Sequence, residues 1–410
     1  MLLPSLIASW LTLSSASSLP SVGSNWNANA ARRAVYFLDN DPSGASIVSL
    51  NVFSNGTLSN PMRTFTKGNG SWAKWIILNP PPPDNTGFAG PDSLFSANAL
   101  TVSGNFLFAV NAGSNTLSMF VIDPSNPQDL ALVREPVSTM GDFPISVTYS
   151  ESLNIACVLN GGTRAGVACF SADESRGLVA LDSSLRSITQ AVNQTTPPGG
   201  PILTASDIMF NPSSTGLFVS TKGAPPSSAG ASPTFGSIYA WPVVGNSVST
   251  TATISQPAGV ILDFSLTFLG TDDSLLLTDA AGVAYILSVS SSLQVTVKNT
   301  FALPSNEGLA CWGVYVQELS SAYVITASTT NITVVNPSTG FANGTITLPT
   351  SDVGVFDSAS DGTYLYSLTN IASIAVVDLA ANTPKMIQNL DLGAIGARKG
   401  WQGMGIYSSA

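Results

Sequence analysis

Short apolar runs separated by Gly, Asn and Ser recur along the whole chain. The clearest copy spans residues 96–123, where apolar segments lie at 98–103, 106–110 and 117–122, and a fourth follows at 130–137. Strands of this length joined by tight turns predict an antiparallel meander. Because one small sheet of four strands is not stable alone, the chain should contain further copies of it.

Six complete copies of this pattern can be traced. Their first strands are expected to begin at Asn98, Pro144, Asp207, Ile261, Ala310 and Gly354. The spacing of roughly 45–60 residues is typical of four-stranded propeller blades. The outer strand of the third blade is less clearly marked and is expected at 185–189, and the outer strand of the fourth blade is expected at 248–254.

The two ends of the chain complete the count. Residues 34–39, 47–52 and 62–67 read as three strands that lack an innermost partner, and 400–408 has the pattern of an innermost strand. If this tail pairs beside 35–38, a ring of seven blades closes without a free edge. We therefore predict an all-β, seven-bladed β-propeller of four-stranded antiparallel blades, closed by the C-terminal strand joining the first blade. A pair of β-sandwich domains is the alternative, but it does not explain why the tail completes the count.

Composition agrees with a turn-rich β protein. The chain has 410 residues, of which 44% are hydrophobic and 9% charged, with 35 Gly, 26 Pro and no histidine. Apolar residues recur at spacing two or in short blocks, so no amphipathic helix is expected. The net charge of -10 argues against a nucleic-acid partner, since nucleic-acid binders present basic faces.

The N-terminal residues indicate secretion. An apolar run followed by small residues predicts a signal peptide at 1–16, cut at or a few residues after Ala16, then a segment at 17–33 and one propeller domain at 34–408. No other apolar run reaches the roughly 18 residues that a membrane span needs. We expect a secreted, extracellular monomer. Five Asn-x-Ser/Thr sequons predict surface glycosylation, at Asn55, Asn69, Asn193, Asn331 and Asn343.

Several stretches together resemble one family. They are VYFLDNDPSG (35–44), SANALTVSGNFLFAVNAGSNTLSMFVID (96–123), GDFPISVTYS (141–150), GLFVSTKG (216–223), LLLTDAAG (275–282) and GLACWGVYV (308–316). The order of these motifs resembles the lactonase-type seven-bladed propellers, which include 6-phosphogluconolactonase-like proteins, fungal carboxymuconate cyclases and allergen-like secreted fungal proteins. The resemblance implies the fold over most of the chain. It implies function more weakly, because these motifs build blades and one fold hosts many functions.

The chain departs from the enzymes of this group in one respect. The resemblance implies a histidine with arginines and a glutamate around the central cavity, yet this sequence has no histidine. That absence removes the most usual general base, every Ser-His-Asp or Cys-His mechanism and the commonest metal ligand. A hydrolase here would depend on carboxylates or a lysine. We expect neither a metal nor a cofactor.

Candidate site residues follow from blade geometry. Loops that enter the first strands, and loops between second and third strands, should meet around one mouth of the central channel, where ligands bind in closed β architectures. Glu307, Arg164 and Lys222 are the candidate catalytic residues, as one proton-transfer group and two anion-binding groups. The candidate ligand-binding residues are Asn98, Asn111, Asn160, Asp279, Trp312 and Gln402. The alternatives are turn chemistry for the Asn and Asp residues and solvated loop charges for the others.

The three cysteines divide into a pair and a single residue. Cys157 and Cys169 fall opposite each other on adjacent strands, so secretion favours a disulfide between them, with two buried free thiols as the alternative. Cys311 is left over beside Trp312 and could face the channel. Without a histidine to activate it, we expect no nucleophilic role.

Three function classes remain. The first is a non-catalytic carrier or allergen-like protein that binds a small anionic or apolar molecule at the channel mouth. The second is a lactonase- or cyclase-like enzyme acting on a small anionic lactone or muconate-type acid without a histidine base. The third is an extracellular surface interaction module. Convergence of Arg164, Lys222 and Glu307 in one pocket would favour the enzyme.

Overall fold

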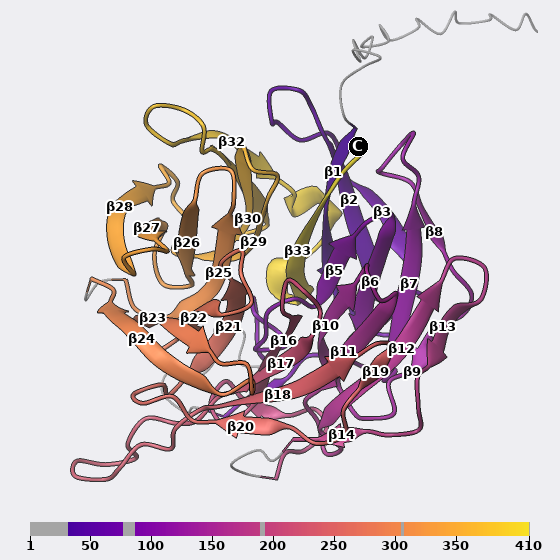
Figure 1. The fold of residues 1–410 in the computed structure, drawn as a ribbon. Helices are drawn as coiled ribbons and strands as arrows, with labels where there is room; N and C mark the ends of the chain where they lie inside the picture. Colours follow the sequence, from indigo (N-terminus) through magenta and orange to yellow (C-terminus); the bar gives the residue numbers. More distant parts are fainter. Residues whose placement is uncertain (1–31, 77–86, 189–192, 305–306, 410) are drawn as a thin grey trace, which may run out of the picture. The chain divides into compact units, whose positions relative to one another are not determined.

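Seven antiparallel sheets surround a central axis in the computed structural model, which describes residues 32–76, 87–188, 193–304 and 307–409 (Figure 1). From the centre outwards, the first blade is β33 (Trp401–Ser408), β1 (Arg33–Asp39), β2 (Ser46–Val52) and β3 (Met62–Phe65). The second is β5 (Leu100–Ser103), β6 (Phe106–Asn111), β7 (Thr116–Ile122) and β8 (Leu130–Leu132), with β9 (Val137–Ser138). The third is β10 (Pro144–Ser150), β11 (Ile155–Asn160), β12 (Gly166–Asp173) and β13 (Gly177–Ala180), with β14 (Arg186–Ser187).

The remaining four blades follow in chain order. The fourth is β16 (Ala205–Phe210), β17 (Gly216–Thr221), β18 (Ser237–Val244) and β19 (Ser247–Val248), with β20 (Thr253–Ser255). The fifth is β21 (Asp263–Phe268), β22 (Ser274–Asp279), β23 (Val283–Val289) and β24 (Val295–Ala302). The sixth is β25 (Ala310–Val316), β26 (Ser321–Thr326), β27 (Asn331–Asn336) and β28 (Phe341–Thr347). The seventh is β29 (Val355–Ser360), β30 (Tyr364–Thr369), β31 (Ser373–Asp378) and β32 (Lys385–Asp391).

The C-terminal strand closes the ring as the sequence predicts. β33 pairs antiparallel with β1, and its register places Val35 opposite Ile406 and Leu38 opposite Gln402. The first blade therefore contains both ends of the propeller. By pairing with β1, β33 covers the inner edge that β1 would otherwise leave unpaired.

The outer strands differ most from the sequence expectation. Where one strand was expected at 248–254, the chain forms β19 and β20, and the fourth strand of the third blade is β13 rather than the expected 185–189. Of that expected strand only β14 is present among the described residues. The turn before β13 begins at Asp173, whose side chain accepts hydrogen bonds from the backbone of Ser175 and Arg176. Outer strands bury few side chains, so their apolar pattern is weak.

The inner strands are buried on both faces because neighbouring blades pack against each sheet. Every residue of β10, β11 and β17 is buried, so polar side chains such as Ser146 and Ser220 are buried along with the apolar ones. Within the described part of the chain the only helices are two short 3-10 turns, and none could cross a membrane.

Bulges at the start of the innermost strands direct side chains toward the axis. The pairing of the first strand with the second shifts by one residue around Phe264 in the fifth blade, around Cys311 in the sixth and around Phe356 in the seventh. An extra residue in one strand bends it and changes where its side chain points. All three of these residues line the cavity described next.

Candidate functional site

A largely apolar cavity of about 440 Å³ lies at the mouth of the central channel where the innermost strands begin. Its lining residues come from the fourth to seventh blades and from the segments that precede the second and fourth blades. They are Trp75, Gly90, Pro91, Asp92, Phe95, Pro201, Ile202, Lys222, Pro225, Leu262, Phe264, Ala280, Leu309, Cys311, Trp312, Ala327, Phe356 and Asn370. The volume falls within the range of small-molecule sites, and an enclosed apolar wall with few polar groups is typical of them.

Two long loops build one wall of this cavity. β4 (Lys74–Trp75), after the first blade, pairs in parallel with β15 (Gly199–Gly200), which precedes the fourth. The ring of Trp75 lies 5.6 Å from that of Phe95. The Pro-rich segment 79–91 also contributes Gly90 and Pro91 to the cavity, although its residues 79–86 lie outside the described part of the chain.

Lys222 is the one cationic side chain among the described residues that line the cavity. It follows β17 and is 3% exposed. Its Nζ donates to the backbone oxygens of Phe95 at 2.6 Å and Ala205 at 3.3 Å, and it lies 4.8 Å from the centre of the Phe264 ring. Burial lowers the pKa of Lys222 to about 8, against the opposing effect of nearby carboxylates, chiefly Asp92 and Asp263.

The carbonyl of Phe95 reaches Lys222 because of an unusual backbone conformation. Phe95 has a φ of 54°, in the left-handed region that non-glycine residues rarely adopt. Leu309, on another part of the cavity wall, has a φ of 64°. Such conformations are concentrated at ligand sites and need support from the surrounding structure.

Asp92 is the carboxyl group on the cavity wall. Its Oδ1 accepts a hydrogen bond from Nε2 of Gln402 at 2.9 Å. Oε1 of Gln402 in turn accepts from the backbone N–H of Leu94 at 2.6 Å. Burial raises the pKa of Asp92 to about 6, although the Gln402 hydrogen bond and the charge of Lys222 both lower it. The carboxyl can therefore change its protonation state near neutral pH.

Further buried charges lie behind the wall. Asp263 is fully buried, and neither of its carboxyl oxygens makes a hydrogen bond with a described residue, so burial raises its pKa well above the usual range. Burial also raises the pKa of Asp357 to about 8 and lowers that of Arg398 to about 10. Arg398 donates to the backbone oxygens of Thr369, Pro91 and Trp401. Shifted groups clustered at one cavity are a common property of functional sites.

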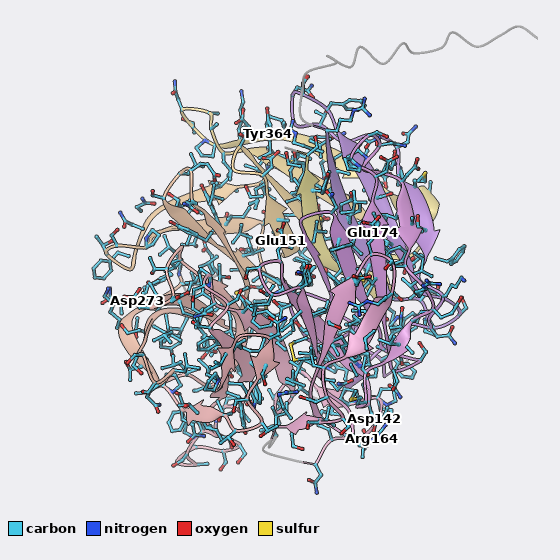
Figure 2. All side chains as sticks on the ribbon, turned by 45° about the vertical axis from the view of Figure 1, so that its right-hand side comes forward. Asp142, Glu151, Arg164, Glu174, Asp273 and Tyr364 are labelled. Carbon is cyan, nitrogen blue, oxygen red and sulfur yellow. A yellow bond between two sulfur atoms is a disulfide. The ribbon has the colours of Figure 1, made fainter. Side chains whose placement is uncertain are left out.

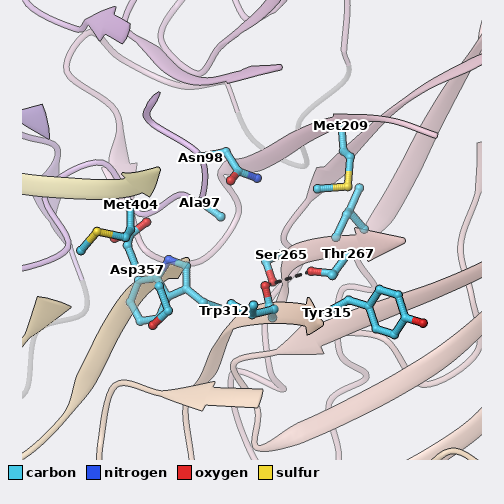
Figure 3. Close-up of a pocket in the computed structure, with 13 residues that line it drawn as sticks. Ala97, Asn98, Met209, Ser265, Thr267, Trp312, Tyr315, Asp357 and Met404 are labelled. Atoms are coloured by element: carbon cyan, nitrogen blue, oxygen red, sulfur yellow. Dashed lines mark hydrogen bonds between the residues drawn. The ribbon is translucent and has the colours of Figure 1, made fainter. Parts of the chain in front are cut away.

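A smaller cavity of about 160 Å³ continues the channel on the other side of Trp312. Figure 3 shows Trp312 and Asp357 beside Met404 at one end of it, with Met209 at the other. The Trp312 ring lies 5.2 Å from Phe264 and 5.1 Å from Phe356, and these three rings form an aromatic floor beneath the larger cavity.

Of the three candidate catalytic residues, the structure places only Lys222 at the cavity. Arg164 is exposed and donates to Asp142, from Nη2 to Oδ1 at 3.0 Å, and Figure 2 shows the pair at the edge of the molecule. Glu307 is buried, and its oxygens accept from Asn331 at 2.7 Å and Thr333 at 2.9 Å on β27. The three residues therefore do not converge in one pocket.

The candidate ligand-binding residues separate into two groups. Trp312 lines both cavities, Asn98 lines the inner one and donates to Asp207 at 2.8 Å, and Gln402 contacts the outer one through Asp92. The others serve turns or blades. Asn111 donates to Ser118, Asn160 to the backbone oxygens of Thr139 and Gly166, and Asp279 accepts from three backbone N–H groups at 2.8–3.0 Å.

The cysteines and sequons also have defined places. Cys157 and Cys169 lie opposite each other on β11 and β12 and form a disulfide, whereas Cys311 is a buried free thiol on the cavity wall. Four of the sequon asparagines are exposed, at Asn55, Asn69, Asn193 and Asn343. Asn331 is partly buried and donates to Glu307. No group of three or more potential metal-binding Cys, Asp or Glu side chains occurs within the described residues.

Sequence reasoning missed Asp92, Asp263, Asp357 and Arg398. Asp92 follows the Pro-rich segment 79–91, where no strand register predicts the direction of its side chain. Asp263 and Asp357 begin innermost strands, and a bulge decides which side of the strand each side chain takes. One signal was available in the sequence. Asp207, Asp263 and Asp357 each stand near the start of a first strand, in a chain that has few charged residues.

The fold and the cavity define a class of protein: a seven-bladed β-propeller with an apolar site at one mouth of its channel. Solved structures share this fold. A candidate 6-phosphogluconolactonase from Bacteroides fragilis matches with a TM-score of 0.60 and 12% identity over 93% of this chain and 99% of that one. One from Bacteroides uniformis matches with 0.60 and 14% over 93% and 100%. Apo AztD from Citrobacter koseri matches with 0.52 and 12% over 93% and 99%.

These likenesses establish the architecture. The chain is thus a seven-bladed β-propeller with the fold of these structures, as the sequence motifs indicate. No family model matches the chain, and no curated protein matches it. At this level of identity, function has to be argued from the site.

Proposed function

We propose that the protein binds a small, largely apolar organic molecule with an anionic end in the cavity at the channel mouth. The observation that carries this proposal is the placement of the Lys222 ammonium in an otherwise apolar wall. With a pKa of about 8, most of this amine is protonated at neutral pH. Backbone oxygens accept two of its hydrogens, which leaves a third for a ligand oxygen.

The aromatic floor supports an apolar or aromatic body for this ligand. Phe264, Trp312 and Phe356 present ring surface, and their mutual contacts hold them in place. A cavity of about 440 Å³ exceeds the roughly 150 Å³ apolar cavity that is known to hold one benzene molecule. A ligand with one or two rings therefore fits.

Calorimetric titration with benzoate and the uncharged benzyl alcohol tests the proposal. Benzoate should bind more tightly than benzyl alcohol, and Lys222→Met should remove the difference. A charge-assisted hydrogen bond contributes about 1.5–3 kcal/mol, or about ten- to hundredfold in affinity. The matched control is Lys385→Met, since Lys385 is exposed on β32. Failure of the protein to bind either probe, or equal benzoate affinity in wild type and Lys222→Met, would contradict the proposal.

A second candidate function is lactone hydrolysis, which the position and pKa of Asp92 favour. A carboxylate with a pKa of about 6 can take a proton from water, while Lys222 donates to the lactone carbonyl. Two of the solved structures with this fold are named as candidate lactonases. Hydrolysis of δ-valerolactone, lost in Asp92→Asn, would establish this function. If the protein binds benzoate but hydrolyses no lactone, the hydrolase proposal is wrong and the binding function stands alone.

We also propose that the protein is secreted. The apolar run at 1–16 lies outside the described residues, and four exposed sequons with one disulfide support an oxidising, extracellular setting. Expression in a secreting eukaryotic host should give protein in the medium whose mass falls on endoglycosidase treatment. Retention of unglycosylated protein inside the cells would contradict it.

A further inference from the structure

The side chain of Lys222 is placed as a nucleophile as well as a cation. It is almost fully buried, and the surface it does present belongs to a cavity with a predominantly apolar wall. Nucleophilic lysines that form Schiff bases are activated by a desolvated, apolar surrounding of this kind. Two solvent-exposed lysines of the same chain, Lys67 and Lys385, have no such surrounding and provide an internal comparison.

The hydrogen bonds of Lys222 fix the direction of its reactive lone pair. A neutral amine has two hydrogens and one lone pair. The oxygens of Phe95 and Ala205 accept the two hydrogens at 2.6 and 3.3 Å. The lone pair is therefore left on the side away from these two carbonyls, where the amine adjoins the cavity and the ring of Phe264.

We propose that Lys222 forms a reversible imine with a small apolar aldehyde or ketone that enters the cavity. The lone pair of Nζ attacks the carbonyl carbon, and the amine proton moves to the carbonyl oxygen to give a carbinolamine. Loss of water from this adduct leaves a carbon–nitrogen double bond. One carbonyl group and one amine thus give one imine and one water, with no oxidant or reductant.

Asp92 is placed to handle the protons of this sequence. Loss of water requires an acid to protonate the departing hydroxyl and a base to take the proton from nitrogen. The Asp92 carboxyl lies on the same cavity wall and is oriented by Gln402, and its pKa of about 6 suits both directions of transfer. The face of Phe264 next to Nζ stabilises the positive charge of a protonated imine.

This inference rests on the proposed function, because the aldehyde has to occupy the same cavity as benzoate. The full-length protein is incubated with benzaldehyde and sodium cyanoborohydride, which reduces an imine to a stable benzylamine, and the product is analysed by intact mass and peptide mapping. Labelling at Lys222 should be at least tenfold faster than at Lys385, and benzoate should slow it at Lys222 alone. Lys222→Arg keeps the charge and should lose only the fast label.

The outcomes separate the two proposals. Benzoate binding without preferential labelling of Lys222 overturns the imine and leaves the binding function. Absence of both overturns both. Because the comparison of Lys222 with Lys385 uses the wild-type protein, it remains decisive even if Lys222→Arg does not fold.

Discussion

Gln402 donates from Nε2 to Oδ1 of Asp92 at 2.9 Å, across a sequence separation of 310 residues. Gln402 belongs to β33, the strand that closes the ring, and Asp92 belongs to the wall of the cavity. The same contact therefore links closure of the propeller to the orientation of the site. A ligand held near Asp92 would depend on the last strand of the chain.

Replacing Gln402 with Leu should lower stability and alter the site together. The buried N–H of Leu94 would lose its acceptor, which costs about 1–3 kcal/mol, and Asp92 would lose the hydrogen bond that lowers its pKa. We expect a lower melting temperature and a higher pKa for Asp92. Thermal unfolding and the pH dependence of benzoate binding measure the two effects. Gln256→Leu, at an exposed position, is the matched control and should change neither.

Truncation after Leu392 should prevent stable folding. It removes β33, so β1 would expose an unpaired edge toward the channel and Asp92 would lose Gln402. We expect aggregation or loss of the cooperative melt, measured by scanning calorimetry and light scattering. A control that ends at Ser409 keeps β33. An unchanged melt in the long truncation would show that the ring does not need its last strand.

The architecture was predictable because it depends on patterns that repeat. Inner strands such as β6, expected at 106–110 and found at Phe106–Asn111, are buried on both faces and read as apolar blocks between turn residues. Closure by the C-terminal strand was predictable because the first blade has only three strands near the N-terminus and residues 400–408 supply the fourth. The outer strands of the third and fourth blades were placed wrongly; half of the residues of β13 contact solvent, so it leaves little apolar pattern.

The site was predictable only where a regular strand register reaches it. Lys222 follows a blade strand and Trp312 lies near the start of one, and both line the cavity. Asp92 lies in an irregular insertion, and the direction of Asp357 depends on a bulge that sequence spacing does not reveal. Arg164 and Glu307 were assigned to the right kind of loop, but the partners that hold them, such as Asp142, are visible only in three dimensions.

Variants of Arg164 and Glu307 should leave ligand binding unchanged. Arg164→Ala breaks an exposed ion pair with Asp142, and solvent screens such pairs strongly, so stability should hardly change. Glu307→Ala removes the acceptor of Asn331 and Thr333 and should cost about 1–3 kcal/mol. Denaturant unfolding and benzoate titration test both. A tenfold loss of benzoate affinity in either variant would show that the replaced residue contributes to ligand binding.

Stability should fall as the pH rises from about 4 to about 8. Burial raises the pKa of Asp92 and Asp207 to about 6 and that of Asp357 to about 8, so in this window the folded protein binds more protons than the unfolded chain. The folded state loses this advantage as each carboxyl ionises. Lys222 has the opposite effect, but only above about pH 8. Because its pKa is lowered in the folded state, the folded protein there binds fewer protons than the unfolded chain, and stability rises with pH.

We therefore expect the melting temperature to be highest near pH 4–5 and to decrease toward pH 8. Asp357→Asn should flatten the upper part of this profile, because the amide occupies the same space without titrating, whereas Asp273→Asn, on an exposed turn, should not. Thermal unfolding at constant ionic strength in steps from pH 4 to pH 8 provides the measurement. A melting temperature that rises across this range would mean that the carboxyls at the channel are ionised in the folded protein at acid pH, and Asp92 could not then serve as an acid at neutral pH.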